Sequence, residues 1–336
     1  MLGGNASRRG HNPRLDLDDP EIAARTLHTQ IRKKPLLEAF YADVYRRFQA
    51  VVERAAVPAR AGITPSATPS SSADTTSGGR DASGANAGSG AHAMSRAVGD
   101  VVELGSGGGF LKAFIPEAIT TDVFPFEGVD RVVDARRLPF EDQSLRAVLL
   151  LNVFHHIPDV AAFLSELSRC LTFEGRALIV DQYPGWLSRP IYRYLHHEPF
   201  DAKARAWTFA PTGPLSGANG ALAWMVFIRD RPRFEREFPG LRIESIIRHT
   251  PLVYWLSGGL KRWCLVPRAL SGAAQVLDRT LLRLSADAAS FIDIELVRSS
   301  PRPKPHGELD RTAYSTNADS ANGEIEGRPR PKVPRA

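Results

Sequence analysis

Short apolar runs and helical stretches alternate through the middle of this 336-residue chain. The apolar runs read DVVELG, AITTDVFP, VDRVVDARRLPF, RAVLLLNVFHHIPD and GRALIVDQY. VAAFLSELSRCL, which precedes the last of them, has helical spacing. Two later runs, LRIESIIRHT and ASFIDIELVRS, lie on either side of a helical stretch at 269–284. Strands that alternate with helices predict an α/β fold with a doubly wound, mostly parallel sheet and helices on both faces.

The outer parts of the chain differ in composition. Residues 21–57 space their large apolar side chains at intervals of three and four, which predicts an N-terminal helical segment that Pro35 breaks or starts. Residues 1–20, 58–98 and 299–336 have few large apolar side chains and are predicted to be disordered. The remaining residues, 99–298, are predicted to form the folded core.

Four glycines lie within five positions at ELGSGGG, between an apolar run and a helical one. Gly105 allows a tight turn, Gly107 lets the backbone approach a ligand, and Gly109 lets helix and strand pack closely. Such a junction holds either the pyrophosphate of a dinucleotide or the methionine and ribose of S-adenosylmethionine.

Acidic residues near the glycines favour the second ligand. Glu103 precedes Gly105 and would repel a pyrophosphate, whereas it suits an ammonium or a sulfonium group. Asp122 ends the next strand, where a carboxylate can accept hydrogen bonds from both ribose hydroxyls. Asp134 could accept a hydrogen bond from an adenine amino group, with the Ala135 backbone beside it.

The segments VVELGSGGG, TTDV, VVDARRLPF, LLLNVFHHIPD and AAFLSELSRCLTFEGRALIVD, in this order, resemble class I S-adenosylmethionine-dependent methyltransferases, and most closely the methyltransferase type 11 branch. The resemblance implies a Rossmann-like sheet of seven strands, one of them antiparallel, and a substrate-binding insertion after the fifth strand at about 184–270. It also implies roles for individual residues. The methionine side would be lined by Glu103, Gly105, Ser106, Gly107 and Gly109. Asp122 would hold the ribose, Asp134 and Ala135 the adenine, and Asn152 would lie close to the sulfonium.

Histidines are the candidate catalytic bases, since methyl transfer to oxygen often needs a base that titrates near neutrality. His155 and His156 directly follow the fourth strand, where ligands lie in open α/β sheets. His197 belongs to a second pair, His196-His197, beside Glu198. We predict no metal, because adjacent histidines do not face one side of a helix and no spaced third ligand is evident. A hydrogen-bonding substrate site and a structural network remain open for the second pair.

Charge and hydropathy limit the partners. The net charge of +6 is spread over scattered basic residues, which favours a solvated surface and leaves contact with an anionic partner, such as a membrane surface or a phosphorylated substrate, as the second interpretation. No run of about 18 apolar residues or secretory signal is present, so we expect a cytoplasmic protein. The strand end NVFHH lacks the Asn/Asp-Pro-Pro-aromatic motif of base methylation, so we expect no nucleic-acid partner.

The sequence therefore predicts an S-adenosylmethionine-dependent methyltransferase. We expect transfer to an oxygen of a small-molecule or lipid- or sugar-linked acceptor. The alternatives are a nicotinamide-dependent oxidoreductase on a similar sheet, against which Glu103 argues, and a non-catalytic cofactor-binding protein. The sequence leaves the acceptor and the oligomeric state open.

Overall fold

The computed structural model describes residues 29–55, 99–196, 198–210 and 217–299. The strands are β1 (Asp100–Leu104), β2 (Ile119–Asp122), β3 (Arg131–Val132), β4 (Leu145–Leu151), β5 (Leu171–Gln182), β6 (Leu241–His249) and β7 (Phe291–Arg298). The α-helices are α2 (Pro35–Arg54), α3 (Val160–Cys170), α4 (Ser188–Tyr194), α5 (Leu222–Trp224), α6 (Arg231–Glu237), α7 (Val253–Leu256) and α8 (Ser271–Leu284). Short 3-10 turns lie at Phe110–Ala113, Phe154–His156, Arg268–Leu270 and Ala286–Ala288, and a π-helical turn at Met225–Arg229.

The strands form one seven-stranded sheet in the order β3-β2-β1-β4-β5-β7-β6. Strand β7 pairs antiparallel with both β5 and β6, and the pairs from β3 to β5 are parallel. The sequence prediction of a Rossmann-like, mostly parallel sheet with one antiparallel strand is confirmed. The order runs outward in both directions from β1 and β4, so the crevice between their carboxyl ends is the place where such sheets bind ligands.

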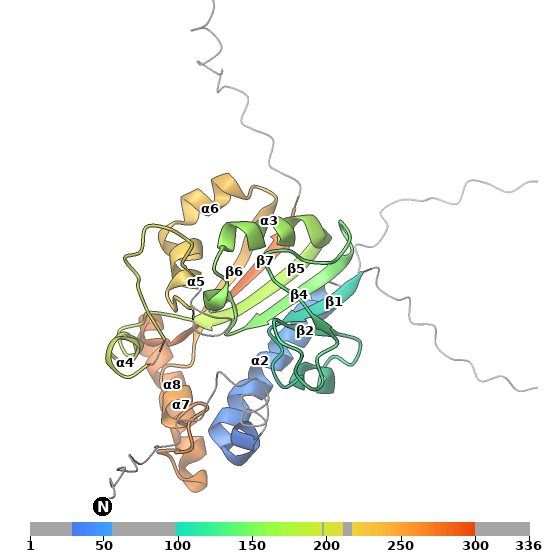
Figure 1. Cartoon of the computed structure of the whole chain (residues 1–336). Helices are drawn as coiled ribbons and strands as arrows, with labels where there is room; N and C mark the ends of the chain where they lie inside the picture. The colour runs from blue at the N-terminus through green and yellow to red at the C-terminus, as the bar shows by residue number, and fades with distance from the viewer. Residues whose placement is uncertain (1–28, 56–98, 197, 211–216, 300–336) are drawn as a thin grey trace, which may run out of the picture. The chain divides into compact units, whose positions relative to one another are not determined.

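Helices cover both faces of the sheet (Figure 1). Strand β4 explains why, because its consecutive apolar residues divide between two cores. Ala147 and Leu149 pack with the residues of α2, whereas Val148 and Leu150 pack with those of α3. A continuous apolar run is therefore required here, as in any strand that is buried on both sides.

Helix α2 belongs to the same core as the sheet. Phe48 and Val44 are fully buried on its inner face, and Pro35 begins the helix at a position where its missing N–H is not needed. Arg47 pairs with Asp293 of β7, and the Arg54 Nη2 atom lies 3.0 Å from the Glu295 Oε2 atom of the same strand. The N-terminal helix is thus fastened to the last strand of the sheet.

Some local expectations change. The stretch after the glycines forms only the 3-10 turn Phe110–Ala113, because α2 covers this face of the sheet instead. Strand β6 lies inside the range 184–270, so that range includes part of the core sheet. Within the same range, helix α5 follows a glycine-containing stretch, and residues 211–216 lie outside the described part. The segments predicted to be disordered also lie outside it, apart from Ser299.

Candidate active site

The glycine turn after β1 is tightly bent and closely packed. Gly105, Gly107 and Gly109 have φ angles of 68°, 52° and 69°, in the left-handed region that glycine adopts without strain. A Cβ atom on Gly105 would lie 2.2 Å from a methyl carbon of Val153, which follows β4. The Ser106 hydroxyl accepts a hydrogen bond from the Thr121 N–H at 3.1 Å. These contacts hold the turn against the ends of β2 and β4, so the backbone of residues 105–109 borders the crevice.

Two buried acceptor atoms beside this turn have no hydrogen-bond partner among the described residues. They are the Oε2 atom of Glu103, on β1, and the Oδ1 atom of Asn152, directly after β4. Burial raises the pKa of Glu103 to about 8, and the Ser106 hydroxyl only partly offsets this increase. A buried carboxylate without a partner is costly, so both atoms call for a donor or a cation from outside the protein. The ammonium group of S-adenosylmethionine fits that requirement.

Asp122 ends β2 on the same edge of the sheet. Its side chain is buried and accepts hydrogen bonds from the N–H groups of Gly107, at 3.0 Å, and Phe124, at 3.3 Å. Burial raises its pKa, whereas these backbone contacts and the nearby His156 act in the opposite direction. The carboxylate is thus held beside the glycine turn, where the resemblance places the ribose hydroxyls.

Asp134 lies farther out, after β3. Its side chain is about half exposed, and both of its oxygens are within 3.1 Å of the Arg136 guanidinium, which lowers its pKa. Ala135 packs against the core beside it. The structure therefore places Asp134 at the predicted edge but already paired with a cation. An adenine amino group would have to share that carboxylate with Arg136.

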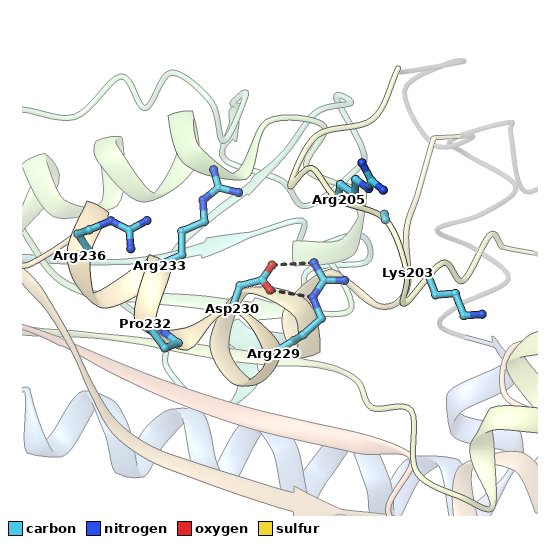
Figure 2. A pocket seen from close by; sticks show the side chains of 8 residues that line it. Lys203, Arg205, Arg229, Asp230, Pro232, Arg233 and Arg236 are labelled. Carbon is cyan, nitrogen blue, oxygen red and sulfur yellow. Dashed lines mark hydrogen bonds and ion pairs between the residues drawn. The ribbon is translucent and has the colours of Figure 1, made fainter.

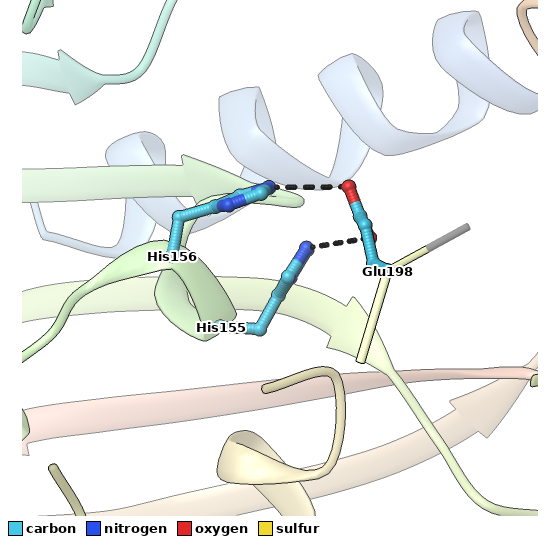
Figure 3. A group of neighbouring side chains, drawn as sticks. All are labelled: His155, His156 and Glu198. Atoms are coloured by element: carbon cyan, nitrogen blue, oxygen red, sulfur yellow. Dashed lines mark ion pairs between the residues drawn. The ribbon is translucent and has the colours of Figure 1, made fainter. Parts of the chain in front are cut away.

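The predicted histidines form a cluster with Glu198 (Figure 3). The His155 Nε2 atom is 3.3 Å from Glu198 Oε2, and the His156 Nε2 atom is 3.4 Å from Glu198 Oε1. On its other side, the His155 Nδ1 atom is 2.6 Å from Asp181 Oδ1 at the end of β5. His155 is buried, whereas the His156 side chain is 22% exposed. His156 is therefore the histidine of this pair that a bound molecule can reach.

The charges in the cluster divide the roles of the two histidines. Burial alone would lower the pKa of His155, but Asp181 and then Glu198 raise it to about 10. Burial would raise the pKa of Glu198, and His155 and His156 lower it below its usual range. Carboxylates thus engage both ring nitrogens of His155, which suits positioning and not proton uptake from an acceptor.

Sequence reasoning considered the two histidine pairs separately and missed their connection. Glu198 follows the second pair, yet its carboxylate reaches back to His155 and His156, and His196 Nδ1 lies 3.7 Å from the same carboxylate. The ligand atoms of His155, His156 and Glu198 lie within 4.8 Å of one another, so they could hold a metal ion. The third metal ligand that the sequence did not reveal is present in space. His197 lies outside the described residues.

A cavity lined largely by basic side chains lies apart from the cofactor residues and the histidine cluster. This cavity of about 540 Å³ is lined by Lys203, Ala204, Arg205, Arg229, Asp230, Pro232, Arg233 and Arg236 (Figure 2). Arg229 pairs with Asp230 through two contacts of 2.7 and 2.8 Å, and Arg231 pairs with Glu235 at 2.8 Å. The predicted cofactor residues and the histidine cluster do not line this cavity, and its central arginine is already neutralised.

Comparison with known proteins finds a methyltransferase domain in part of the chain. A family model described as a methyltransferase domain matches residues 84–179. No curated protein matches the chain. Similar solved structures include geranyl diphosphate C-methyltransferase from Streptomyces coelicolor A3(2), with a TM-score of 0.35 and 16% identity over 60% of this chain and 73% of that one. A putative methyltransferase from Bacillus halodurans C-125 has a TM-score of 0.32 and 17% identity over 60% of this chain and 93% of that one.

The sheet order, the glycine turn and the family match define the class. The chain contains a class I S-adenosylmethionine-dependent methyltransferase domain, and S-adenosylmethionine is its cofactor. Its two unpartnered acceptors and its left-handed glycines fit that cofactor. None of the helices in the described residues is long and apolar enough to cross a membrane.

Proposed function

We propose that this enzyme transfers the methyl group to an oxygen atom of a small-molecule, lipid-linked or sugar-linked acceptor that lies against His156. The observation that carries the proposal is the cluster of His155, His156 and Glu198, which begins three residues after Asn152; its member His156 lies near enough to Asp122 to offset part of the increase that burial causes in the pKa of that carboxylate. A hydroxyl acceptor must be aligned with the donated methyl group and must lose a proton, and a group of hydrogen-bond acceptors serves both needs.

The cofactor supplies a methyl group on a sulfonium, which is already a good leaving group. In the proposed complex, Glu103 pairs with the cofactor ammonium, Asp122 holds the ribose hydroxyls, and Asp134 and Ala135 border the adenine. Asn152 lies nearest to the sulfonium. His156 contacts the acceptor, and His155 acts as a positioning residue because Asp181 and Glu198 hold its ring. We keep His197 as a third candidate on the sequence evidence alone.

The buried carboxyl group of Glu103 supports this function over a nicotinamide-dependent oxidoreductase, since an ammonium group stabilises its ionised form whereas a pyrophosphate beside the glycine turn would oppose that ionisation. A non-catalytic cofactor-binding protein would share the cofactor site. It would have no need of a histidine cluster that remains partly open next to the cofactor.

The segment 261–284 supports a lipid-linked acceptor and weak contact with a membrane surface. Its exposed basic side chains are Lys261, Arg262, Arg268, Arg279 and Arg283. Its exposed large apolar side chains are Trp263, Leu265, Leu270, Val276, Leu277 and Leu284. The one acid in this segment, Asp278, is buried and accepts hydrogen bonds from the backbone N–H groups of Leu252 and Val253. Basic and apolar side chains without an exposed acid match an anionic lipid surface.

Turnover with a labelled donor tests the methyl transfer. We expect the wild-type enzyme to label a hydroxyl-bearing acceptor from a panel that also contains amine acceptors. His156→Ala should cut kcat strongly and leave the affinity for S-adenosylhomocysteine unchanged. His249→Ala, which removes a histidine from a different carboxylate pair, is the matched control. Labelling of amines alone would contradict the oxygen assignment, and cofactor binding without labelling of any acceptor would favour the non-catalytic alternative.

Sedimentation with lipid vesicles tests the membrane contact. The protein should sediment with vesicles that contain phosphatidylglycerol and not with phosphatidylcholine vesicles, and added salt should release it. Leu277→Glu should abolish the effect, whereas Phe173→Glu, at an exposed apolar position on β5, should not. Equal sedimentation of both variants, or concentration-dependent self-association that Leu277→Glu abolishes, would reject the membrane contact.

A further inference from the structure

Three side chains with possible metal-ligand atoms converge in the histidine cluster. The Nε2 atoms of His155 and His156 each face one oxygen of the Glu198 carboxylate, at 3.3 and 3.4 Å (Figure 3). The three residues come from two distant parts of the chain, the turn after β4 and the segment after α4. Their convergence is therefore a product of the fold and not of sequence neighbourhood.

The opposite side of each imidazole ring is also fixed by an acceptor. The His155 Nδ1 atom is 2.6 Å from Asp181 Oδ1, and the His156 Nδ1 atom is 3.2 Å from the carbonyl oxygen of Gly217. Each Nδ1 therefore carries a proton and donates it outward. This tautomer directs the Nε2 lone pairs of neutral rings toward Glu198, and metal-binding histidines are oriented in the same way. Neutral rings then present their lone pairs to the carboxylate, an arrangement that a proton or a metal ion can bridge.

The spacing fits a metal ion. Metal–ligand bonds of about 2.1 Å in a tetrahedral site give a separation of about 3.4 Å between neighbouring ligand atoms. The two contacts to Glu198, one to each of its oxygens, are within 0.1 Å of that separation, and one ligand atom from each of the three residues lies within 4.8 Å of the others. We propose that His155, His156 and Glu198 form a binding site for one divalent transition-metal ion, with Asp181 and Gly217 as the outer contacts that orient the two histidines. Two imidazoles and one carboxylate favour Zn²⁺ or a similar ion over Mg²⁺, which prefers oxygen ligands alone.

Gln182 offers a further possible metal ligand beside the histidine cluster. The Gln182 side-chain nitrogen is 3.0 Å from Glu198 Oε2 and 3.4 Å from His155 Nε2, and its side-chain oxygen has no hydrogen-bond partner among the described residues. Because the amide can turn over, that oxygen can face the ion. With three protein ligands from the cluster, the fourth position is left for Gln182, for water or for an acceptor oxygen. In the metal-bound state the ion, and not the His156 ring, would meet the acceptor.

Zinc uptake tests the site in the absence of the methyl donor and of any methyl acceptor, so its outcome is independent of the proposed methyl transfer. Purified protein would be dialysed against buffered Zn²⁺ at several free concentrations and analysed for metal content. We expect one Zn²⁺ per chain in the wild type. Affinity should fall about 10–100-fold in Asp181→Asn, as expected for an outer contact, and by more in His156→Ala and Glu198→Gln. Bound Co²⁺ should give the visible absorption of a four- or five-coordinate ion.

His249→Ala is the matched control, because His249 pairs with Asp293 at 2.8 Å without lying in the cluster. It should retain the wild-type zinc affinity. If His156→Ala does not fold, the zinc affinity of Glu198→Gln alone tests the metal site, because this substitution keeps the size of the side chain. Equal zinc affinity in the wild type and Glu198→Gln would overturn the proposal and leave a hydrogen-bonded network held together by a proton on His155.

Discussion

Replacement of Glu103 by glutamine should change how the stability of the cofactor-free enzyme depends on pH. Glu103 is only 2% exposed, and burial raises its pKa from 4.5 to about 8. The folded protein therefore binds a proton that the unfolded chain has lost between these two pH values. The stability that this proton confers is present below about pH 4.5 and is lost as the pH rises through about 8.

The magnitude follows from the two pKa values. Between them, the free energy of unfolding should fall by about 1.4 kcal/mol per pH unit, or by roughly 3 kcal/mol from pH 5.5 to pH 8. Glutamine has nearly the same shape and does not ionise. Glu103→Gln should therefore lack this slope and be more stable than the wild type at about pH 8, by up to about 4 kcal/mol.

Urea denaturation of both proteins at several pH values measures the effect. The difference between them isolates Glu103, because the other groups titrate alike in both. Glu53→Gln, at an exposed carboxyl on α2, is the control and should reproduce the wild-type slope. Parallel pH profiles for the wild type and Glu103→Gln would refute the reasoning. Glu103→Gln should also bind S-adenosylhomocysteine more weakly, because the ammonium group of the ligand loses its carboxylate partner. In the wild type, binding near neutral pH should release the proton of Glu103.

Three further variants test the fold and the cofactor site. Asp122→Ala should nearly abolish binding of S-adenosylhomocysteine in a calorimetric titration, and unchanged affinity would remove the ribose assignment. Gly105→Ala should weaken cofactor binding and lower the melting temperature, because its Cβ would lie 2.2 Å from Val153 and its φ angle of 68° strains alanine. An unchanged melting temperature in Gly105→Ala would show that Val153 does not pack tightly against the turn. Phe48→Ala should destabilise the enzyme by about 3–5 kcal/mol in urea denaturation, and a loss below about 1 kcal/mol would mean that α2 is not part of the core.

The sheet was predictable because its signals are local. Strands β1, β4 and β5 each contain consecutive buried apolar residues, and those of β4 supply both cores. The predicted run VDRVVDARRLPF forms only the two-residue exposed strand β3, Arg131–Val132. The glycine turn and the acids Glu103 and Asp122 are likewise readable, since each lies at a fixed distance from the end of a strand. The order of the strands along the chain and the backbone turns that follow them are therefore enough to place these residues.

The candidate acceptor site was only half predictable. His155 and His156 follow a recognisable strand, but Glu198 reaches them from a segment after α4 whose path depends on long-range packing. Asp181 lies inside the apolar run of β5 and gives no signal of its own until its contact with His155 is seen. The length of the helix after the glycines was likewise set by a distant element, because α2 already occupies that face.

The attachment of α2 to β7 affects when the protein can fold during its synthesis. Helix α2 is synthesised before all the described strands, and β7, which carries its ion-pair partners Asp293 and Glu295, is synthesised after the other six. Until β7 emerges, neither the helix nor the sheet edge at β5 has its final neighbour. A nascent chain that stops within the matched methyltransferase segment would lack the strand to which α2 is fastened. We therefore expect folding to be cooperative over the whole described region and to lag behind synthesis, which makes release of the last strand the step that commits the enzyme to its native state.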